Sequence, residues 1–124
     1  MVSWRLVGVD VTAGRRVHER FECDLHVVLA YEGSEYETTA DNVSLGGFYL
    51  LTDAKIPYGS QVTVRFRLPA IKETSTVQGT VRWNKADGVG VQFGSLRALE
   101  VWGLNQYFKT LRLLPSEFPD KNDG

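Results

Sequence analysis

Three arginines and a histidine crowd into six consecutive positions near the start of the chain. Arg15, Arg16, His18 and Arg20 lie in the stretch GRRVHERF, in a protein of 124 residues whose formal net charge is only -1. A solvated surface usually mixes its signs, so such a cluster indicates either a local anionic partner or a basic linker. Arginine suits an anionic partner because its planar fork binds phosphate oxygens in pairs and its flat face stacks on bases.

A second group of residues that could bind a ligand is NVSLGG, at positions 42–47. Asn42 and Ser44 offer side-chain oxygens that can accept hydrogen bonds from a ligand. Gly46 and Gly47 favour a sharp turn and let a ligand approach the backbone without a Cβ in the way. Taken alone, these residues are also typical of a turn in which Asn and Ser bond their own backbone.

The sequence offers little for catalysis or metal binding. It has two histidines and one cysteine, so a zinc site is not expected, and His18 has no partner at a spacing typical of a nucleophile and its base. Cys23 falls on the apolar side of its predicted strand and is interpreted as a small core residue. A single cysteine cannot form an internal disulfide, which fits a reducing compartment.

Composition limits the remaining classes. With 43% hydrophobic and 23% charged residues, the chain is predicted to fold as one globular domain. Its 14 basic and 15 acidic side chains argue against a protein that binds nucleic acid polymers. No apolar run is long enough to cross a bilayer, and Arg5 and Asp10 interrupt the opening stretch that could resemble a signal peptide, so we expect a cytoplasmic protein.

After residue 20, apolar and polar residues alternate, which is typical of half-buried strands. Gly, Pro, Asn, Asp and Ser occupy the short segments between these runs, as turns require. Six runs of this kind predict an all-β fold, an antiparallel barrel or sandwich, and we favour the small barrel because closure removes exposed strand edges. The predicted strands cover residues 21–31, 35–43, 48–52, 61–68, 77–83 and 89–93. Trp83 is expected to pack in the core or at the rim, and contact with a base is its less favoured use.

From Arg97 to Leu114 the spacing of apolar residues becomes helical, and Pro115 is expected to end this C-terminal helix. One side should pack on the barrel through Val101, Leu104, Tyr107, Phe108 and Leu111. Leu99, Trp102 and Leu113 fall opposite, and two interpretations stay open for them: a crowded groove, or a surface for a homodimer or another protein.

The two motifs together resemble those of the PilZ domain family, receptors for the bacterial second messenger cyclic di-GMP. That family is marked by Arg-x-x-x-Arg followed by (Asp/Asn)-x-Ser-x-x-Gly at the end of an early strand. Here Arg16 and Arg20 supply the first motif, and NVSLGG supplies the second, 22 positions after Arg20. The resemblance covers roughly residues 14 to 110, extends to the GVGVQF stretch at 88–93, and implies a six-stranded antiparallel barrel with a C-terminal helix.

The resemblance implies a receptor without catalytic activity, cofactor or metal. Cyclic di-GMP would draw the arginine segment onto the barrel, and an unidentified protein would read the changed surface. Arg16 and Arg20 are assigned to guanine stacking and phosphate, Asn42 and Ser44 to a guanine edge. Gly46 and Gly47 are assigned to the turn and close approach, and Arg15 to a further stacking contact. The domain is expected over residues 14–114, with an extension at 1–13 that could add a strand, and a flexible tail at 115–124. The alternative is a PilZ-fold adaptor that binds a protein without nucleotide.

Overall fold

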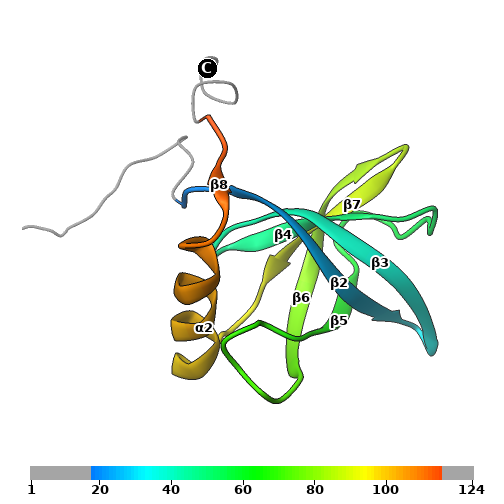
Figure 1. Cartoon of the computed structure of the whole chain (residues 1–124). Coiled ribbons are helices and arrows are strands. Elements are labelled where there is room, and N and C mark those ends of the chain that lie inside the picture. The colour runs from blue at the N-terminus through cyan, green and yellow to red at the C-terminus, as the bar shows by residue number, and fades with distance from the viewer. Residues whose placement is uncertain (1–17, 116–124) are drawn as a thin grey trace, which may run out of the picture.

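The structure is a computed structural model that describes residues 18–115. The elements in this part of the chain are seven strands and one helix (Figure 1). Their bounds are β2 Phe21–Tyr31, β3 Ser34–Val43, β4 Gly47–Leu51, β5 Gln61–Phe66, β6 Ser75–Lys85, β7 Gly88–Phe93, α2 Ala98–Phe108 and β8 Arg112–Leu113. The strand predicted for residues 1–13 and most of the predicted tail lie outside the described residues.

Six of the strands form a closed antiparallel barrel. Neighbouring strands follow the order β3-β4-β7-β6-β5-β2, and β2 pairs with β3 to close the circle. The seventh strand, β8, adds two residues to the beginning of β2. The six-stranded barrel predicted from the alternating pattern is therefore confirmed.

Alternation along each strand builds the core of the barrel. In β2, Leu25, Val27 and Leu29 are buried while the residues between them face outward or lie at intermediate depth. Three aromatic rings meet near the centre, where Phe48 packs edge-on against Phe66 and Phe93, with ring centroids 5.4 and 4.9 Å away. This edge-to-face packing is the arrangement that aromatic quadrupoles favour.

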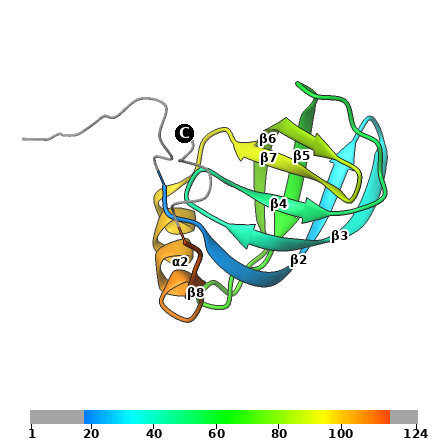
Figure 2. The same ribbon diagram turned by 90° about the horizontal axis from the view of Figure 1, so that it is seen from above.

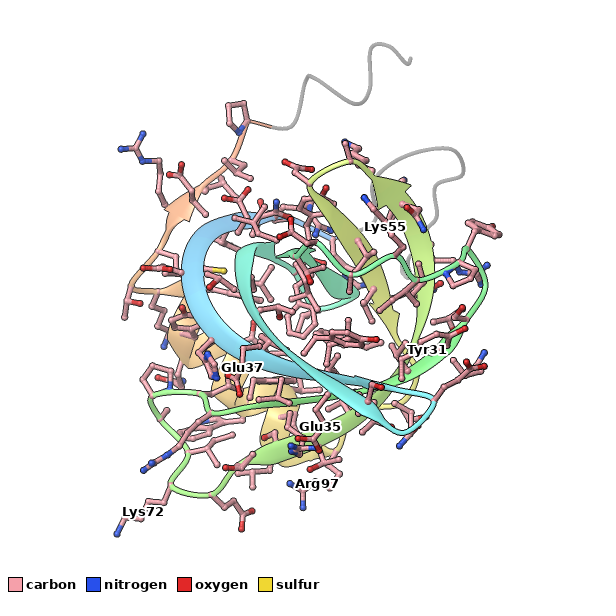
Figure 3. The ribbon with its side chains drawn as sticks, turned by 90° about the vertical axis from the view of Figure 1, so that its right-hand side faces the viewer. Tyr31, Glu35, Glu37, Lys55, Lys72 and Arg97 are labelled. Atoms are coloured by element: carbon pink, nitrogen blue, oxygen red, sulfur yellow. The ribbon has the colours of Figure 1, made fainter. Side chains whose placement is uncertain are left out.

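The outer face of the barrel mixes charges of both signs. On β3, Glu35 and Glu37 project from this face (Figure 3), where Glu35 accepts from Arg65 at 3.1 Å and Glu37 lies 2.8 Å from His26. These exposed pairs contribute little to stability. They do neutralise one another, so this side of the barrel is not a basic surface.

Helix α2 is shorter than the sequence predicted. It ends at Phe108, and the chain then turns, with the N–H and the hydroxyl of Thr110 both donating to the carbonyl oxygen of Tyr107. The prediction of a helix to Leu114 was wrong because the residues before Pro115 pair with β2 as β8, and a helix cannot supply that pairing. Leu113 consequently lies on a strand and not on the helix.

The packing side of α2 was predicted correctly at most positions. Leu104 and Phe108 are buried against the core, while Val101, which was expected there, is 36% exposed. Leu99 and Trp102 are exposed, which does not fit the crowded groove that was one of the two interpretations. The helix stands at one end of the barrel, beside β8 and the start of β2 (Figures 1 and 2). Among residues 18–115, no helix has the length and apolar character needed to span a membrane.

Candidate functional site

The turn between β3 and β4 carries the second motif. The Ser44 N–H donates to the Gly47 carbonyl oxygen at 2.8 Å, and the Gly46 N–H donates to the Ser44 hydroxyl at 3.0 Å. Ser44 is therefore buried inside its own turn, with 1% of its surface exposed. The turn holds Asn42 and Ser44 at one rim of the barrel.

Gly47 is required by the neighbouring strand. A Cβ at this position would lie 2.0 Å from the carbonyl oxygen of Val91 in β7, a distance that no folded backbone tolerates. At Gly46, a Cβ would instead meet the imidazole of His18 at 2.9 Å. The close approach expected at Gly47 is thus made by the barrel itself, and contact of either glycine with a ligand stays a prediction.

Arg20 joins the first motif to the second. Its Nε donates to Oδ1 of Asn42 at 2.7 Å, and its Nη1 lies 3.4 Å from the Ser44 hydroxyl oxygen. The two residues that accept from Arg20 are more than twenty positions away in the sequence, yet they lie beside it at the barrel rim. Arg15 and Arg16 lie outside the described residues.

The Cys23 thiol on β2 is not activated as a nucleophile. Burial raises the pKa of the Cys23 thiol to about 11, and its Sγ donates to the Ala40 carbonyl oxygen at 3.3 Å. A protonated, hydrogen-bonded thiol is a poor nucleophile. Within residues 18–115, no group of three or more His, Cys, Asp or Glu side chains could hold a metal ion.

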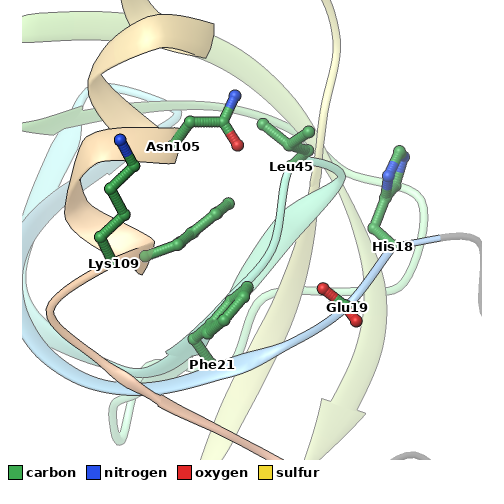
Figure 4. A pocket seen from close by; sticks show the side chains of 7 residues that line it. His18, Glu19, Phe21, Leu45, Asn105 and Lys109 are labelled. Carbon is green, nitrogen blue, oxygen red and sulfur yellow. The ribbon is translucent and has the colours of Figure 1, made fainter.

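A pocket of about 660 Å³ adjoins the rim, between the start of β2 and helix α2 (Figure 4). Its apolar lining includes Phe21 and Leu45, and Glu19, Asn105 and Lys109 contribute polar groups. The pocket could not be predicted from the sequence because alternation indicates which residues are buried but not where an end of the barrel stays open. His18 and Phe108 complete its lining.

Aromatic side chains continue the outer face from the rim across the barrel. Asn42 pairs with Tyr49, Tyr49 with Gly90, and Gly90 with Trp83, so the four lie in one row across β3, β4, β7 and β6. A Cβ on Gly90 would lie 2.4 Å from Cε3 of Trp83, so the indole rests over this glycine. Trp83 is 56% exposed. In the closed circle of six strands, β6 is three strands from β3 in either direction, so Asn42 and Trp83 lie on opposite sides of the barrel.

The described residues thus define a class of protein, a small closed barrel whose rim joins a basic segment to a polar turn between two strands. The chain belongs to the PilZ domain family, whose sequence model matches residues 14–107. This is a family of cyclic di-GMP receptors that are generally not catalytic. Comparison with curated protein sequences gives no significant match.

Several solved structures share the fold. MotI (DgrA), the inhibitor of motility of Bacillus subtilis, is 23% identical, with a TM-score of 0.65 over 77% of this chain and 50% of that one. PlzA of Borreliella burgdorferi, solved with c-di-GMP, is 16% identical, with a TM-score of 0.62 over 77% of this chain and 41% of that one. The PilZ domain of Escherichia coli YcgR, also solved with c-di-GMP, is 14% identical, with a TM-score of 0.60 over 88% of this chain and 98% of that one.

These identities are low, so the likeness establishes the fold alone. The chain spans half or less of the length of MotI and PlzA. Functions of those whole proteins do not transfer to this chain by structural similarity.

Proposed function

We propose that this protein is a non-catalytic receptor for cyclic di-GMP that works in the cytoplasm and passes the signal to a partner protein. One observation carries the proposal: the guanidinium of Arg20 contacts both Asn42 and Ser44 at the barrel rim. Residues of both family motifs therefore stand where one ligand can touch them together.

The chemistry of this rim matches the ligand. Cyclic di-GMP carries two phosphodiester charges and two guanines, so its receptor needs planar cations and groups that read a purine edge. Arg20 supplies the first, together with Arg15 and Arg16 from the preceding segment. Asn42 supplies oxygen and nitrogen at the rim for a guanine edge, and Ser44 holds the turn that presents it.

The structural relatives support a role in binding cyclic di-GMP and in motility. YcgR and PlzA were solved with c-di-GMP, and MotI is described as an inhibitor of motility. A non-catalytic receptor passes on its signal by changing what it binds. Control of motility through a protein partner is the corresponding role for this chain.

Isothermal titration with cyclic di-GMP tests the proposal. The wild-type chain should give saturable binding in the micromolar range or tighter. Each charged hydrogen bond contributes roughly 1.5 to 3 kcal/mol, so R16A and R20A should each weaken binding about tenfold or more. R67A, which removes an exposed arginine at the end of β5, is the matched control and should bind as the wild type does.

Circular dichroism must show that every variant is folded. Folded wild-type protein that gives no heat would overturn the receptor proposal and favour the adaptor. If R67A and R20A lost the same affinity for cyclic di-GMP, the loss would be due to net charge alone. That result would also count against a ligand site at the rim.

A further inference from the structure

The segment that carries Arg20 is bonded along both of its edges. Its first two strand residues, Phe21 and Glu22, pair with the end of β3 on one side and with β8 on the other. Beyond the last residue of β8, the Leu114 N–H donates to the carbonyl oxygen of Arg20 at 2.9 Å. The backbone of the proposed ligand-binding arginine is therefore held directly by the C-terminal segment.

A second contact links the same segment to helix α2. The ring of Phe21 stacks on that of Phe108, the last residue of the helix, with centroids 4.4 Å apart and planes 12° from parallel. Glu22 and Arg112 add an ion pair at 3.4 Å, but both side chains are exposed and contribute little. The backbone bond and the ring stack are the substantial links.

The first residues of β2 are set apart from the regular ladder of the barrel. The register of β2 shifts between Glu22 and Leu25, and such a bulge bends the strand and interrupts its pairing locally. On the side that faces α2, a pocket lined by residues that include Glu19 and Lys109 adjoins the segment (Figure 4). The links through β8 consequently matter for where Arg20 lies.

We propose that β8 positions Arg20 for the ligand and that ligand binding in turn strengthens the pairing of β8 with β2. This inference rests on the receptor function proposed above. In the structure, Arg20 reaches Asn42 and Ser44 while its carbonyl group is bonded to Leu114, so the two sets of contacts are compatible. We expect the coupling to be positive because a backbone already held by Leu114 has less freedom to lose when Arg20 binds the ligand, and by thermodynamic linkage the coupling has the same size in both directions.

Because of this coupling, the segment formed by β8 and Leu114 can signal to a partner protein that ligand is bound. A ligand at the rim stabilises β8, and β8 fixes the direction in which the chain leaves the barrel after Leu114. A protein partner can then distinguish the ligand-bound state at this end of the barrel, beside helix α2 (Figure 2). No movement of the barrel strands is needed for this relay.

The first test removes the N–H of Leu114 from the full chain. L114P deletes the donor, and the preceding Leu113 keeps the extended backbone that a residue before proline favours. L114A is the matched control, since it shortens the same side chain but keeps the N–H. Titration with cyclic di-GMP should give a Kd raised about three- to tenfold in L114P and within about twofold of wild type in L114A.

The second test uses the wild-type chain alone and therefore holds even if L114P fails to fold. Amide hydrogen exchange at Leu114 should slow about three- to tenfold when cyclic di-GMP saturates the protein, since linkage makes the two effects equal. The Gly59 amide, which donates to the Val81 carbonyl oxygen at 2.8 Å, is the control and should not change. A β8 with only a structural role would show no ligand-dependent protection.

The outcomes separate this inference from the proposed function. Absence of binding by the wild type would overturn the receptor function and the coupling with it. Binding accompanied by unchanged or faster exchange at Leu114 would overturn the coupling and leave the receptor intact. Equal affinities of folded L114P and L114A would overturn the positioning role of β8.

Discussion

The Oδ1 atom of Asn42 accepts a hydrogen bond from Nε of Arg20 at 2.7 Å, across a sequence separation of 22 residues. The donor belongs to the segment before β2, and the acceptor to the last residues of β3. This one bond fixes the side chain of a cation at the barrel rim. Replacing Asn42 therefore tests how much its Oδ1 acceptor contributes to ligand binding.

Two replacements of Asn42 should distinguish the effect of its side-chain size from the effect of its Oδ1 acceptor on binding. N42L has nearly the same size but cannot accept from Arg20, and we expect it to bind cyclic di-GMP about tenfold more weakly. N42D keeps an acceptor and matches the alternative residue of the family motif, so its affinity should stay within about threefold of wild type. Titration of both variants checks this, and equal losses would show that the bond to Arg20 is not what binding requires.

Gly47 should matter for stability more than Gly46 does. In G47A the new methyl group meets the backbone of β7, which cannot move without breaking the barrel, and we expect a loss of about 2 kcal/mol or more. In G46A the obstacle is the side chain of His18, which can rotate away, so a smaller loss is expected. Urea denaturation measures both. A G47A variant as stable as wild type would contradict the tight approach to Val91.

Most of the barrel could be predicted from sequence because its core follows a period of two. The alternation at Leu25, Val27 and Leu29 correctly predicted which side chains of β2 face the core. The resemblance led us to expect the arginine segment against the barrel, and Arg20 contacts Asn42 at its rim. The end of the helix could not be predicted in the same way. Apolar spacing near Leu113 fits a helix locally, while its pairing with Phe21 depends on a strand about ninety residues earlier.

The site was less predictable than the fold. The sequence indicated that Gly47 lets a ligand approach the backbone. That the Val91 carbonyl in β7 leaves no room for a Cβ at this position can be seen only once the strand order is known. The row from Asn42 to Trp83 depends on the register of four strands. Such relations are long-range, so local pattern cannot supply them.

Cys23 should react slowly with thiol reagents in the folded protein. Burial raises the pKa of its thiol from 9.0 to about 11, so at pH 8 the thiolate fraction falls about a hundredfold relative to the unfolded chain. A chromogenic disulfide reagent added to native and urea-unfolded protein measures the two rates. A native rate within about tenfold of the unfolded rate would contradict a half-buried thiol that stays protonated.

Glu100 should make the protein sensitive to acid. Hydrogen bonds from Arg97 hold the pKa of the buried Glu100 carboxyl below its usual value of 4.5, although burial opposes this shift. A lowered folded pKa contributes stability that is complete above the unfolded value and is lost as the pH falls through the folded one. The melting temperature of wild type should therefore fall toward that of E100Q below about pH 4.5.

Variants of Glu100 and Glu73, the two acidic partners of Arg97, test this pH dependence of the melting temperature. E100Q still accepts the Arg97 N–H but carries no charge, so its melting temperature should depend less on pH. E73Q removes the other carboxylate near Arg97, which lies 3.7 Å away and is 60% exposed, and should behave as wild type. Parallel curves for wild type and E100Q from pH 7 to 3 would show that the pKa of Glu100 is not lowered.

Trp102 provides the test of self-association through α2. Its side chain is 50% exposed and Leu99 on the same helix is 38% exposed, which leaves apolar area open at one end of the barrel. If two copies pack through this face, W102E should place charges in the interface and convert the dimer into a monomer on sizing chromatography. Y58E, at an aromatic side chain 66% exposed in the loop between β4 and β5, is the matched control and should elute as wild type. An elution volume that W102E leaves unchanged would rule out this face as the dimer interface.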